Sequence, residues 1–338
     1  MNDLPGLDVA RLQSYLQRQR PGLLGSKVSA ELFDGGRSNL TYALTDGETE
    51  IVLRRPPLGH VLATAHDMGR EYRMQRGLAR TAVPVARTVL MCDDPAIIGA
   101  PFYLMELVHG TVYRSSEDTS RLAADDRWAL ADQLVDVLVE LHAVDPVSTG
   151  LADLGRPDGY LERQVGRWGK QLDQSRSRDL PGIDELRDRL GRQVPVSRRS
   201  GVLHGDFRLD NVIVGDDLRV RAVLDWEMAT IGDPLADIGL LLVYWDGLTN
   251  VDNPITTGMG AGAGFPPGDH LAARYASRSG DDVSELDWYV ALGYFKVAVI
   301  LEGIHYRYVH GQTVGAGFDR VGGLVPLFIE RGLALPLR

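Results

Sequence analysis

The sequence predicts an α+β protein in which a β-rich N-terminal part precedes an α-rich C-terminal part. Up to about residue 108, short runs of β-branched, aromatic and other apolar residues alternate with glycine-containing turns. After about residue 109, apolar residues recur at helical spacing. The 338 residues are enough for two domains, or for one large domain with two lobes. We therefore expect a division into residues 1–108 and 109–338.

Five strands are expected in the N-terminal part. They lie near residues 31–33, 40–44, 51–54, 87–91 and 101–107. A Gly35-Gly36 turn before the second run and an Asp46-Gly47 turn after it are typical of consecutive hairpins. A helix is expected after the third run, because Thr64 with Asp67 three residues later resembles a capping box.

Helices are expected to dominate the C-terminal part. They lie near residues 130–141, 183–192 and 289–303. Ser284, with Asp287 three residues later, is expected to cap the last of them. Two short strands, near 201–203 and 219–224, should bracket a polar loop. The Gly- and Pro-rich segment 250–268 is expected to form a loop or lid.

The composition excludes several classes of protein. With 44% apolar and 24% charged residues, the chain resembles an average soluble globular protein. A net charge of −10 argues against binding to nucleic acid. The single cysteine, Cys92, allows no intrachain disulfide, so a reducing, cytoplasmic location is expected. The N-terminus does not resemble a signal peptide and no apolar run approaches 18 residues, so we expect no membrane insertion.

The strongest motif lies in the polar loop between the two short strands. It reads His204-Gly205-Asp206-Phe207-Arg208-Leu209-Asp210-Asn211 and is followed by Asp225 at a strand end. This spacing of two carboxylates and one amide is the layout that phosphoryl transfer from Mg·ATP needs. One carboxylate must orient or deprotonate the acceptor hydroxyl, while an amide oxygen and a second carboxylate hold Mg²⁺. The alternative is an Asx-rich turn between two strands.

Three stretches resemble the aminoglycoside phosphotransferase-like family of small-molecule kinases, which shares the protein-kinase fold. They are residues 35–42, 204–211 and 225–234. Within this family they are most similar to the kinase-like domain fused to some acyl-CoA dehydrogenases, and the resemblance covers residues 30–310 or so. It implies a protein-kinase-like, two-lobed fold, with an ATP-binding lobe at 1–108 and a catalytic, acceptor-binding lobe at 109–338.

The resemblance also implies roles for the residues of the motif. Asp206 corresponds to the catalytic base, and Asn211 and Asp225 correspond to the magnesium ligands. Arg208, two positions after the base, is expected to stabilise the transferred phosphoryl group. A structural ion pair between Arg208 and Asp210 is the alternative.

Further ATP contacts are implied for the N-terminal lobe. Ser38 and Asn39 are expected at the phosphates, although their turn departs from G-x-G-x-x-G and an ordinary hairpin turn is the alternative. Arg54 is expected on the α- and β-phosphates, where the family has a basic residue, and Glu71 is its expected partner. A surface ion pair is the alternative for Glu71. The choice between Arg54 and its neighbour Arg55 as the phosphate ligand remains open.

The segment that joins the lobes is expected to bind adenine. The resemblance places adenine against the backbone of Glu106 and Val108, and an edge strand of the core is the alternative. Several polar residues near the motifs are expected to have structural roles in packing, capping or bracing. They are His142, His204, Asp233 and Asp237.

The predicted function is an ATP- and Mg²⁺-dependent transfer of phosphate to a hydroxyl of a small molecule. A hydroxyacyl-type metabolite is favoured over an aminoglycoside, because segment 239–262 holds only two acids, Asp246 and Asp252, and a drug with several amines needs more. A choline-like amine remains open as the acceptor, and a catalytically silent nucleotide-binding module remains open in place of an enzyme. Contacts to the acceptor are expected from polar and aromatic residues downstream of the motif. These are Glu227, Tyr244, Trp245, Asp246, Glu302 and Tyr306.

Overall fold

The computed structural model describes residues 4–33, 39–58, 66–248, 251, 260–312 and 317–337. The chain forms two compact units. Unit 1 comprises Met1–Gly110 together with Arg221–Glu227. Unit 2 comprises Thr111–Val220 and Met228–Arg338. The short second segment of unit 1 is tied to the first by a hydrogen bond from the Val223 N–H to the Pro84 carbonyl, 2.8 Å long.

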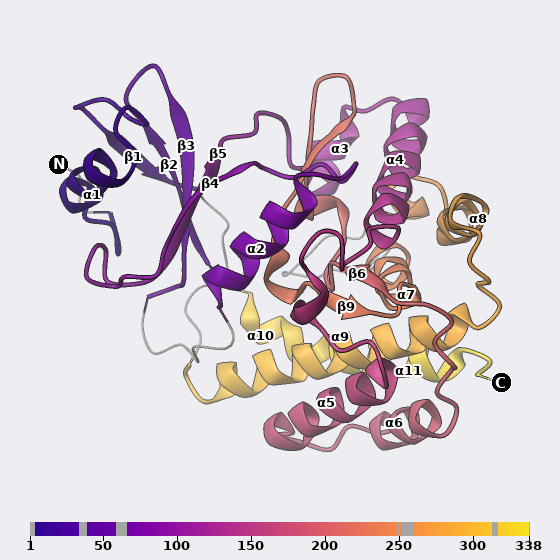
Figure 1. Ribbon diagram of the computed structural model, residues 1–338. Helices are drawn as coiled ribbons and strands as arrows, with labels where there is room; N and C mark the ends of the chain where they lie inside the picture. Colours follow the sequence, from indigo (N-terminus) through magenta and orange to yellow (C-terminus); the bar gives the residue numbers. More distant parts are fainter. Residues whose placement is uncertain are drawn as a thin grey trace. The chain divides into compact units, whose positions relative to one another are not determined.

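Unit 1 is built on an antiparallel sheet of five strands in its described residues, in the order β1-β2-β3-β5-β4 (Figure 1). The strands are β1 (Ser29–Leu32), β2 (Leu40–Thr45), β3 (Glu50–Arg55), β4 (Thr88–Cys92) and β5 (Phe102–Glu106). Each strand overlaps the run expected from the sequence. The Asp46-Gly47 turn closes the β2–β3 hairpin, and Gly47 takes the positive φ of 94° that such a turn requires.

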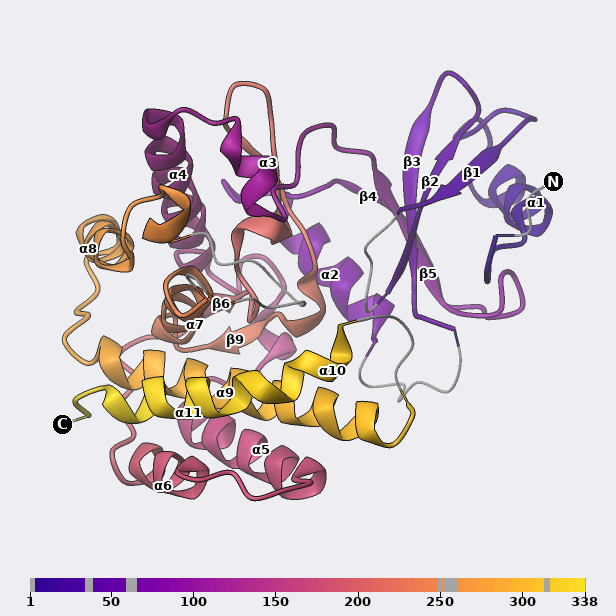
Figure 2. The same cartoon turned by 180° about the vertical axis from the view of Figure 1, so that it is seen from behind.

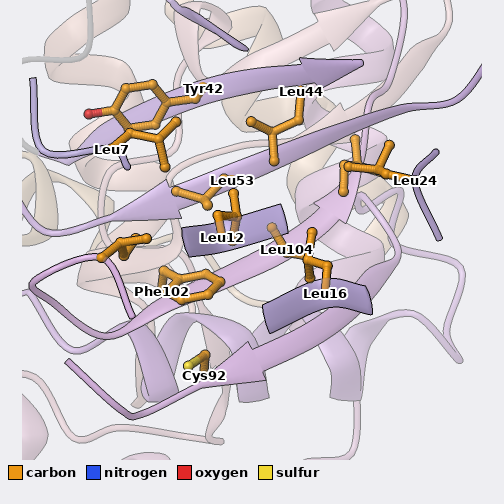
Figure 3. Packing of buried hydrophobic residues seen from close by; sticks show 12 residues of the cluster. Leu7, Leu12, Leu16, Leu24, Tyr42, Leu44, Leu53, Cys92, Phe102 and Leu104 are labelled. Atoms are coloured by element: carbon orange, nitrogen blue, oxygen red, sulfur yellow. The ribbon is translucent and has the colours of Figure 1, made fainter. Parts of the chain in front are cut away.

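Alternation of side chains gives the sheet two apolar faces. Leu53 and Leu104 point to one face, where Leu12 and Leu16 of helix α1 (Val9–Gln19) cover them (Figure 3). On the other face, a second apolar cluster is formed by residues of β3, β5 and helix α2 (Met68–Leu78), including Val52, Met68, Tyr103 and Met105. Helix α1 was not predicted, although Asp8 caps it by accepting a hydrogen bond from the Arg11 N–H.

Helix α2 begins where the sequence indicated, with a different cap. Asp67 is the N-cap residue, and its carboxylate accepts a hydrogen bond of 3.0 Å from the Arg70 N–H. The predicted partner Thr64 lies outside the described residues. Asp67 therefore serves as the cap itself, and does not occupy the third helical position of a capping box.

Unit 2 is mainly helical in its described residues, which confirms the predicted α+β class for the whole chain (Figures 1 and 2). Its helices are α3 (Ser116–Ser120), α4 (Ala124–His142), α5 (Tyr160–Ser175), α6 (Ile183–Arg192), α7 (Leu235–Trp245), α8 (Gly268–Ser279), α9 (Leu286–Val309), α10 (Phe318–Val321) and α11 (Val325–Ala334). Its short strands are β6 (Gly201–Leu203), β7 (Val212–Val214) and β9 (Thr230–Gly232), and β6 pairs antiparallel with β9. The chain passes from unit 2 to unit 1 within β8 (Val220–Val223).

Helix α9 is the central element of unit 2. It packs against α5, α6, α7, α10 and α11, and both views show α11 running along it (Figures 1 and 2). Because α9 is covered on several sides, most of its length is apolar. Helix α7 approaches it closely at Gly239, where an added Cβ would lie 2.6 Å from the Tyr289 carbonyl carbon. No helix in the described ranges has both the length and the apolarity to cross a membrane.

The predicted cap of α9 is wrong. The helix begins at Leu286, and Ser284 lies in a turn before it. The Ser284 N–H donates to the Asp282 carboxylate at 2.9 Å, so Asp282 organises this turn and Ser284 does not act as the helix cap. The helix predicted near residues 289–303 is confirmed, and Tyr289 and Phe295 are buried in it.

Candidate active site

The sequence motif forms a tight loop after β6 in unit 2. His204, Gly205 and Asp206 make the turn, and a short 3₁₀ helix (Leu209–Asn211) leads into β7. Gly205 has a φ of 82°, and an added Cβ would lie 2.6 Å from the Met228 carbonyl oxygen. Any other residue would therefore be strained and would clash there. The glycine before Asp206 is a steric requirement of this turn.

The backbone of this loop is held by a buried carboxylate from helix α7. Asp237 accepts hydrogen bonds from the N–H groups of His204, at 2.6 Å, and Gly205, at 2.9 Å. The ring of His142, buried at the end of α4, lies 3.3 Å from the same carboxylate. The bracing role predicted for Asp237 and the structural role predicted for His142 are thus visible as one buried network.

The Asp237 network is expected to make the stability depend on pH. Burial acts to raise the pKa of Asp237, but hydrogen bonding and charge from His142, together with the His204 N–H, lower it below its ordinary 3.8. The folded state therefore favours the carboxylate, and its contribution is present above pH 3.8 and lost as the pH falls further. Asp237→Asn should lower the free energy of unfolding at pH 7 by about 2 kcal/mol.

Urea unfolding at several pH values tests this prediction. The difference in stability between wild type and Asp237→Asn should shrink as the pH falls below about 4, because the wild-type carboxylate is then protonated. Asp158→Asn, at an exposed aspartate, is the matched control and should change stability little. A difference that stays constant down to pH 2 would contradict the assignment.

The Asp206 carboxylate projects from the turn among hydrogen-bond donors. The Asn211 Nδ2 group donates to the Asp206 carbonyl at 2.8 Å and to its Oδ2 at 3.2 Å. Arg208 Nε lies 3.3 Å from the same Oδ2, and the Tyr244 hydroxyl is also hydrogen-bonded to this side chain. Burial and the charge of Asp206 raise the pKa of Tyr244 well above its ordinary 10.0, so the phenol remains a donor. These contacts hold the Asp206 carboxylate in one orientation. Because 23% of the side chain is exposed, a small molecule can still reach it.

Arg208 makes the predicted ion pair with Asp210 and also lies beside Asp206, the candidate base. Its Nη1 lies 3.1 Å from Asp210 Oδ2, which is the structural pair. Its Nε contact with Asp206 also places the guanidinium beside the candidate base, over the ring of Tyr244 at 5.1 Å. A contact with a transferred phosphoryl group stays a prediction.

Unit 1 contains the basic residue and the carboxylate that were predicted to pair. Arg54 Nε, on β3, lies 2.8 Å from Oε2 of Glu71 on α2, and the Glu71 side chain is only 1% exposed. The pair is therefore buried, which excludes the surface alternative. A second arm, Nη2 of Arg54, lies 2.7 Å from Asp225 Oδ1. Burial opposes the Arg54 charge, but the nearby Glu71 and Asp225 raise the pKa of Arg54 above its ordinary value.

Arg55 has a different environment. Its guanidinium donates to the backbone carbonyls of Gly6, Pro56 and Ile98, and the residue is 4% exposed. Adjacent residues of a strand point to opposite faces, so only one of the two arginines can face Glu71 and Asp225. Of the two arginines, Arg54 is the one that contacts Glu71 and Asp225, and a phosphate contact from it stays a prediction.

Glu71→Gln is expected to lower the free energy of unfolding by about 3 kcal/mol, because it removes the buried one of the two carboxylates that pair with Arg54. Urea unfolding at pH 7 measures this loss. Glu48→Gln, at an exposed glutamate, serves as the control. A loss below about 0.5 kcal/mol, the range of ordinary surface substitutions, would show that the pair contributes little.

Asp225 has a backbone conformation that is rare for a residue with a side chain. Its φ is 62°, in the left-handed region. Strain of this kind is often found at functional sites, where the surroundings hold it in place. Arg54 is the partner that fixes the Asp225 carboxylate in unit 1, and 30% of the side chain is exposed.

Asn39 is buried in the same network. Its Nδ2 donates to Glu71 at 2.7 Å and to Glu227 at 3.3 Å, and its Oδ1 lies 2.8 Å from His66 Nδ1. Because these bonds occupy both ends of the amide, a phosphate contact from Asn39 would have to come from its backbone. Ser38, the other predicted phosphate contact of this turn, lies outside the described residues.

The segment predicted to bind adenine follows β5. The Glu106 N–H donates to the Arg87 carbonyl at 2.9 Å, and the Glu106 carboxylate accepts from the Arg87 N–H at 3.0 Å. The Glu106 carbonyl is therefore the backbone group of this residue that adenine could use. Val108 packs against the apolar cluster that contains Val52 and Met105. The adenine contact itself stays a prediction.

Two of the residues proposed for acceptor binding make hydrogen bonds within the protein instead. Glu302 is fully buried and accepts hydrogen bonds from Ser177 and Arg178, which join the α5–α6 connection to α9. The Trp245 indole donates to the Pro266 carbonyl at 2.8 Å. Much of the segment 250–268 lies outside the described residues. Tyr244 is the acceptor candidate that the structure places next to Asp206.

Lys296 is a neighbour of the motif that the sequence reasoning missed. It lies in the middle of α9, and its Nζ donates to the Gly205 carbonyl at 2.7 Å. A lysine within an otherwise apolar stretch was the available signal. Such a charge needs a partner, but the partner lies 91 residues away in the sequence.

The described ranges contain no group of three or more His, Cys, Asp or Glu side chains that could hold a metal ion. Asn211 and Asp225 nevertheless have the right donor chemistry for Mg²⁺, which prefers oxygen. Since the Asn211 Nδ2 donates to Asp206, its Oδ1 is the atom that could act as a ligand. Arg54 contacts Oδ1 of Asp225, and a second carboxylate oxygen remains as a ligand atom. The two residues belong to different units.

Comparisons with known proteins identify the family of the chain. The sequence profile of the phosphotransferase enzyme family (APH) matches residues 29–279. The chain is 35% identical over 341 residues to acyl-CoA dehydrogenase family member 11 of Rattus norvegicus, covering 98% of this chain and 43% of that protein. It therefore spans less than half the length of this relative. The chain belongs to the phosphotransferase enzyme family.

Solved structures show the same fold. A crystal structure from Ralstonia eutropha JMP134, provisionally described as an aminoglycoside phosphotransferase, is 32% identical with a TM-score of 0.83, covering 96% of this chain and 97% of that one. The GDP and kanamycin complex of APH(2″)-IIIa is 16% identical with a TM-score of 0.63, covering 96% of this chain and 98% of that one. The predicted kinase-like α+β fold is thus confirmed.

Proposed function

We propose that the protein transfers the γ-phosphate of ATP, in the presence of Mg²⁺, to a hydroxyl group of a small molecule. The observation that carries this proposal is the setting of Asp206. Asp206 directly follows Gly205 in a tight turn. Its carboxylate contacts Asn211, Arg208 and Tyr244 and remains partly exposed. A carboxylate held in this way suits a group that must meet a hydroxyl in one orientation. Membership of the phosphotransferase enzyme family supports it.

In this mechanism Asp206 accepts the proton of the acceptor hydroxyl while the hydroxyl oxygen forms a bond to the γ-phosphorus and the bond to ADP breaks. Arg208, beside Asp206, stabilises the charge of the transferred group. Asn211 and Asp225 are proposed to hold Mg²⁺, which neutralises phosphate charge when bound. Arg54 binds the α- and β-phosphates, with Glu71 fixing its orientation.

The remaining contacts follow the division of the chain. We assign ATP binding to residues 1–108 and acceptor binding to 109–338. The backbone of Glu106 and Val108 would meet adenine, and Ser38 and the Asn39 backbone would meet the phosphates. We also assign Asp225, which lies outside 1–108, to the phosphate site, because it is paired with Arg54.

A hydroxyacyl-type metabolite is the acceptor class that we favour. The charged side chains close to Asp206 include the cations Arg208 and Lys296. The nearby acids are already engaged, Asp210 by Arg208 and Asp237 by the N–H groups of the loop. The candidate acid Glu302 is buried and accepts a hydrogen bond from Ser177. A drug with several ammonium groups would need carboxylate partners near the base. The relative's name suggests a link to acyl-CoA metabolism. We place the reaction in the cytoplasm, with no nucleic-acid partner and no membrane insertion.

An alternative acceptor has specific support, whereas an alternative function without catalysis does not. An aminoglycoside acceptor is favoured by the description of the Ralstonia protein and by the net charge of −10. A catalytically silent nucleotide-binding module would have a similar fold, but it would have no chemical need for Asp206, Asn211 and Asp225 together.

A panel of acceptors distinguishes the proposed function from these two. Mg·ATP and Mg·GTP are each combined with hydroxyacyl-CoAs, kanamycin-type aminoglycosides or amino alcohols, and the phosphorylated product is identified by mass spectrometry. We expect a phosphorylated hydroxyacyl product. An aminoglycoside kcat/KM above ~10⁴ M⁻¹s⁻¹ would overturn the acceptor assignment. Tight nucleotide binding with no product from any class would favour the silent module.

A further inference from the structure

Lys296 stands out among the basic residues of the chain. The sequence has three lysines in a total of 36 lysines and arginines, and the other two, Lys27 and Lys170, are exposed. Lys296 lies instead in the middle of the central helix α9, between buried apolar residues. Lys296 itself is half-buried, and an ammonium group at such a position needs compensating acceptors or negative charge.

The surroundings of Lys296 provide a hydrogen-bond acceptor and negative charge. Its Nζ donates to the Gly205 carbonyl at 2.7 Å, and the ammonium lies 5.4 Å from the centre of the Trp168 ring. The charges that act on it include the carboxylates of Asp206 and Asp237 and the cations Arg167 and Arg208. Burial lowers the pKa of Lys296, and the two carboxylates oppose that shift. The ammonium is therefore electrostatically coupled to the candidate base.

The contact with Gly205 completes a clamp on one peptide group. The Gly205 carbonyl and the Asp206 N–H belong to the same planar peptide unit. Lys296 holds the carbonyl, and the ring of His204 accepts a hydrogen bond of 3.2 Å from the Asp206 N–H. Asp237 holds the preceding N–H, that of Gly205, at 2.9 Å. The orientation of this peptide sets the direction in which the Asp206 side chain leaves the backbone.

We propose that Lys296 is a positioning residue for phosphoryl transfer, which fixes the Gly205–Asp206 peptide and places a positive charge beside the Asp206 carboxylate. The inference rests on the proposed role of Asp206 as the base. A lysine suits the position because its compact ammonium can be satisfied by one carbonyl and nearby charge, whereas a guanidinium would need several acceptors in its plane.

A double-mutant cycle tests the proposal. Lys296→Met keeps most of the apolar stem and removes the ammonium, and Lys170→Met is the control that removes the same charge from an exposed site. We measure turnover as ADP release from Mg·ATP with 3-hydroxybutyryl-CoA as acceptor, and Mg·ATP affinity by calorimetry. Lys296→Met should lower kcat by ~10-fold or more and change the Kd of Mg·ATP by less than about twofold.

The cycle separates positioning from general structural support. If Lys296 acts through Asp206, adding Lys296→Met to Asp206→Asn should change turnover by less than about twofold. A purely structural lysine would give additive losses, which would overturn the proposal. Turnover of Lys296→Met within twofold of wild type, while Asp206→Asn is impaired, would also overturn it and leave the proposed function intact. Near-normal turnover of both single variants would refute the proposed function.

Hydrogen exchange supplies a readout that needs no acceptor. The amides of residues 201–211 should exchange about tenfold faster in Lys296→Met than in wild type, and should be unchanged in Lys170→Met. Unchanged exchange in Lys296→Met would contradict the clamp. If Lys296→Met fails to fold, Lys296→Gln replaces it, with the same expected loss of kcat and the same contradicting result.

Discussion

Asp206→Asn is expected to lower kcat at least ~10²-fold while the affinity for Mg·ATP changes by less than about twofold. The reason is that an amide cannot take the hydroxyl proton, although it fills the same space and can still accept a hydrogen bond from Asn211 or Tyr244. The loss should therefore fall on the transition state and leave nucleotide binding intact. Steady-state kinetics on the phosphorylated acceptor, with calorimetry of Mg·ATP, measure the two quantities.

Asp216→Asn provides the matched control for this experiment. Asp216 lies in the turn after β7, close in sequence to the motif, and its side chain is exposed. It should retain wild-type turnover. Near-normal turnover of Asp206→Asn with the true acceptor would show that another group takes the proton, and the base would have to be sought elsewhere.

The strands of unit 1 could be predicted from the sequence because their signal is local. Alternating apolar residues and the Asp46-Gly47 turn depend only on neighbours along the chain, and β2 and β3 lie where expected. Helix α1 was missed although its signals are also local, with Asp8 as a cap and Leu12 and Leu16 four residues apart. The Ser284 cap failed because a neighbouring aspartate, Asp282, took the competing hydrogen bond.

The candidate site was predictable only in part. The spacing within 204–211 identified Asp206, because a loop motif carries its own geometry. The groups that hold this loop come from far along the chain: Asp237 lies 33 residues from His204, and Lys296 lies 91 residues from Gly205. Such contacts depend on how α7 and α9 pack, which a single sequence does not reveal. The Arg54–Glu71 pair was foreseen through the family resemblance, whereas the burial of Asn39 was not.

Asp225→Ala is expected to abolish Mg²⁺-dependent nucleotide binding and turnover while the protein remains folded. Alanine removes the proposed carboxylate ligand, and no other atom of its side chain can replace it. The fold should survive, because Arg54 keeps its contact with the buried Glu71 when the contact with Asp225 is lost. Calorimetric titration of ATP with and without Mg²⁺, together with a thermal melt, measures both effects.

Backbone strain has to be separated from metal binding in this test, because residue 225 has a positive φ of 62° that alanine adopts poorly. Asp225→Asn makes that separation, since asparagine tolerates the left-handed region and keeps the shape of the side chain. The Asn variant should melt close to wild type. It should still bind Mg·ATP much more weakly, because a neutral amide oxygen attracts Mg²⁺ less than a carboxylate does. If both variants bind Mg·ATP and turn over normally, Asp225 is not a metal ligand, and its contact with Arg54 is then purely structural.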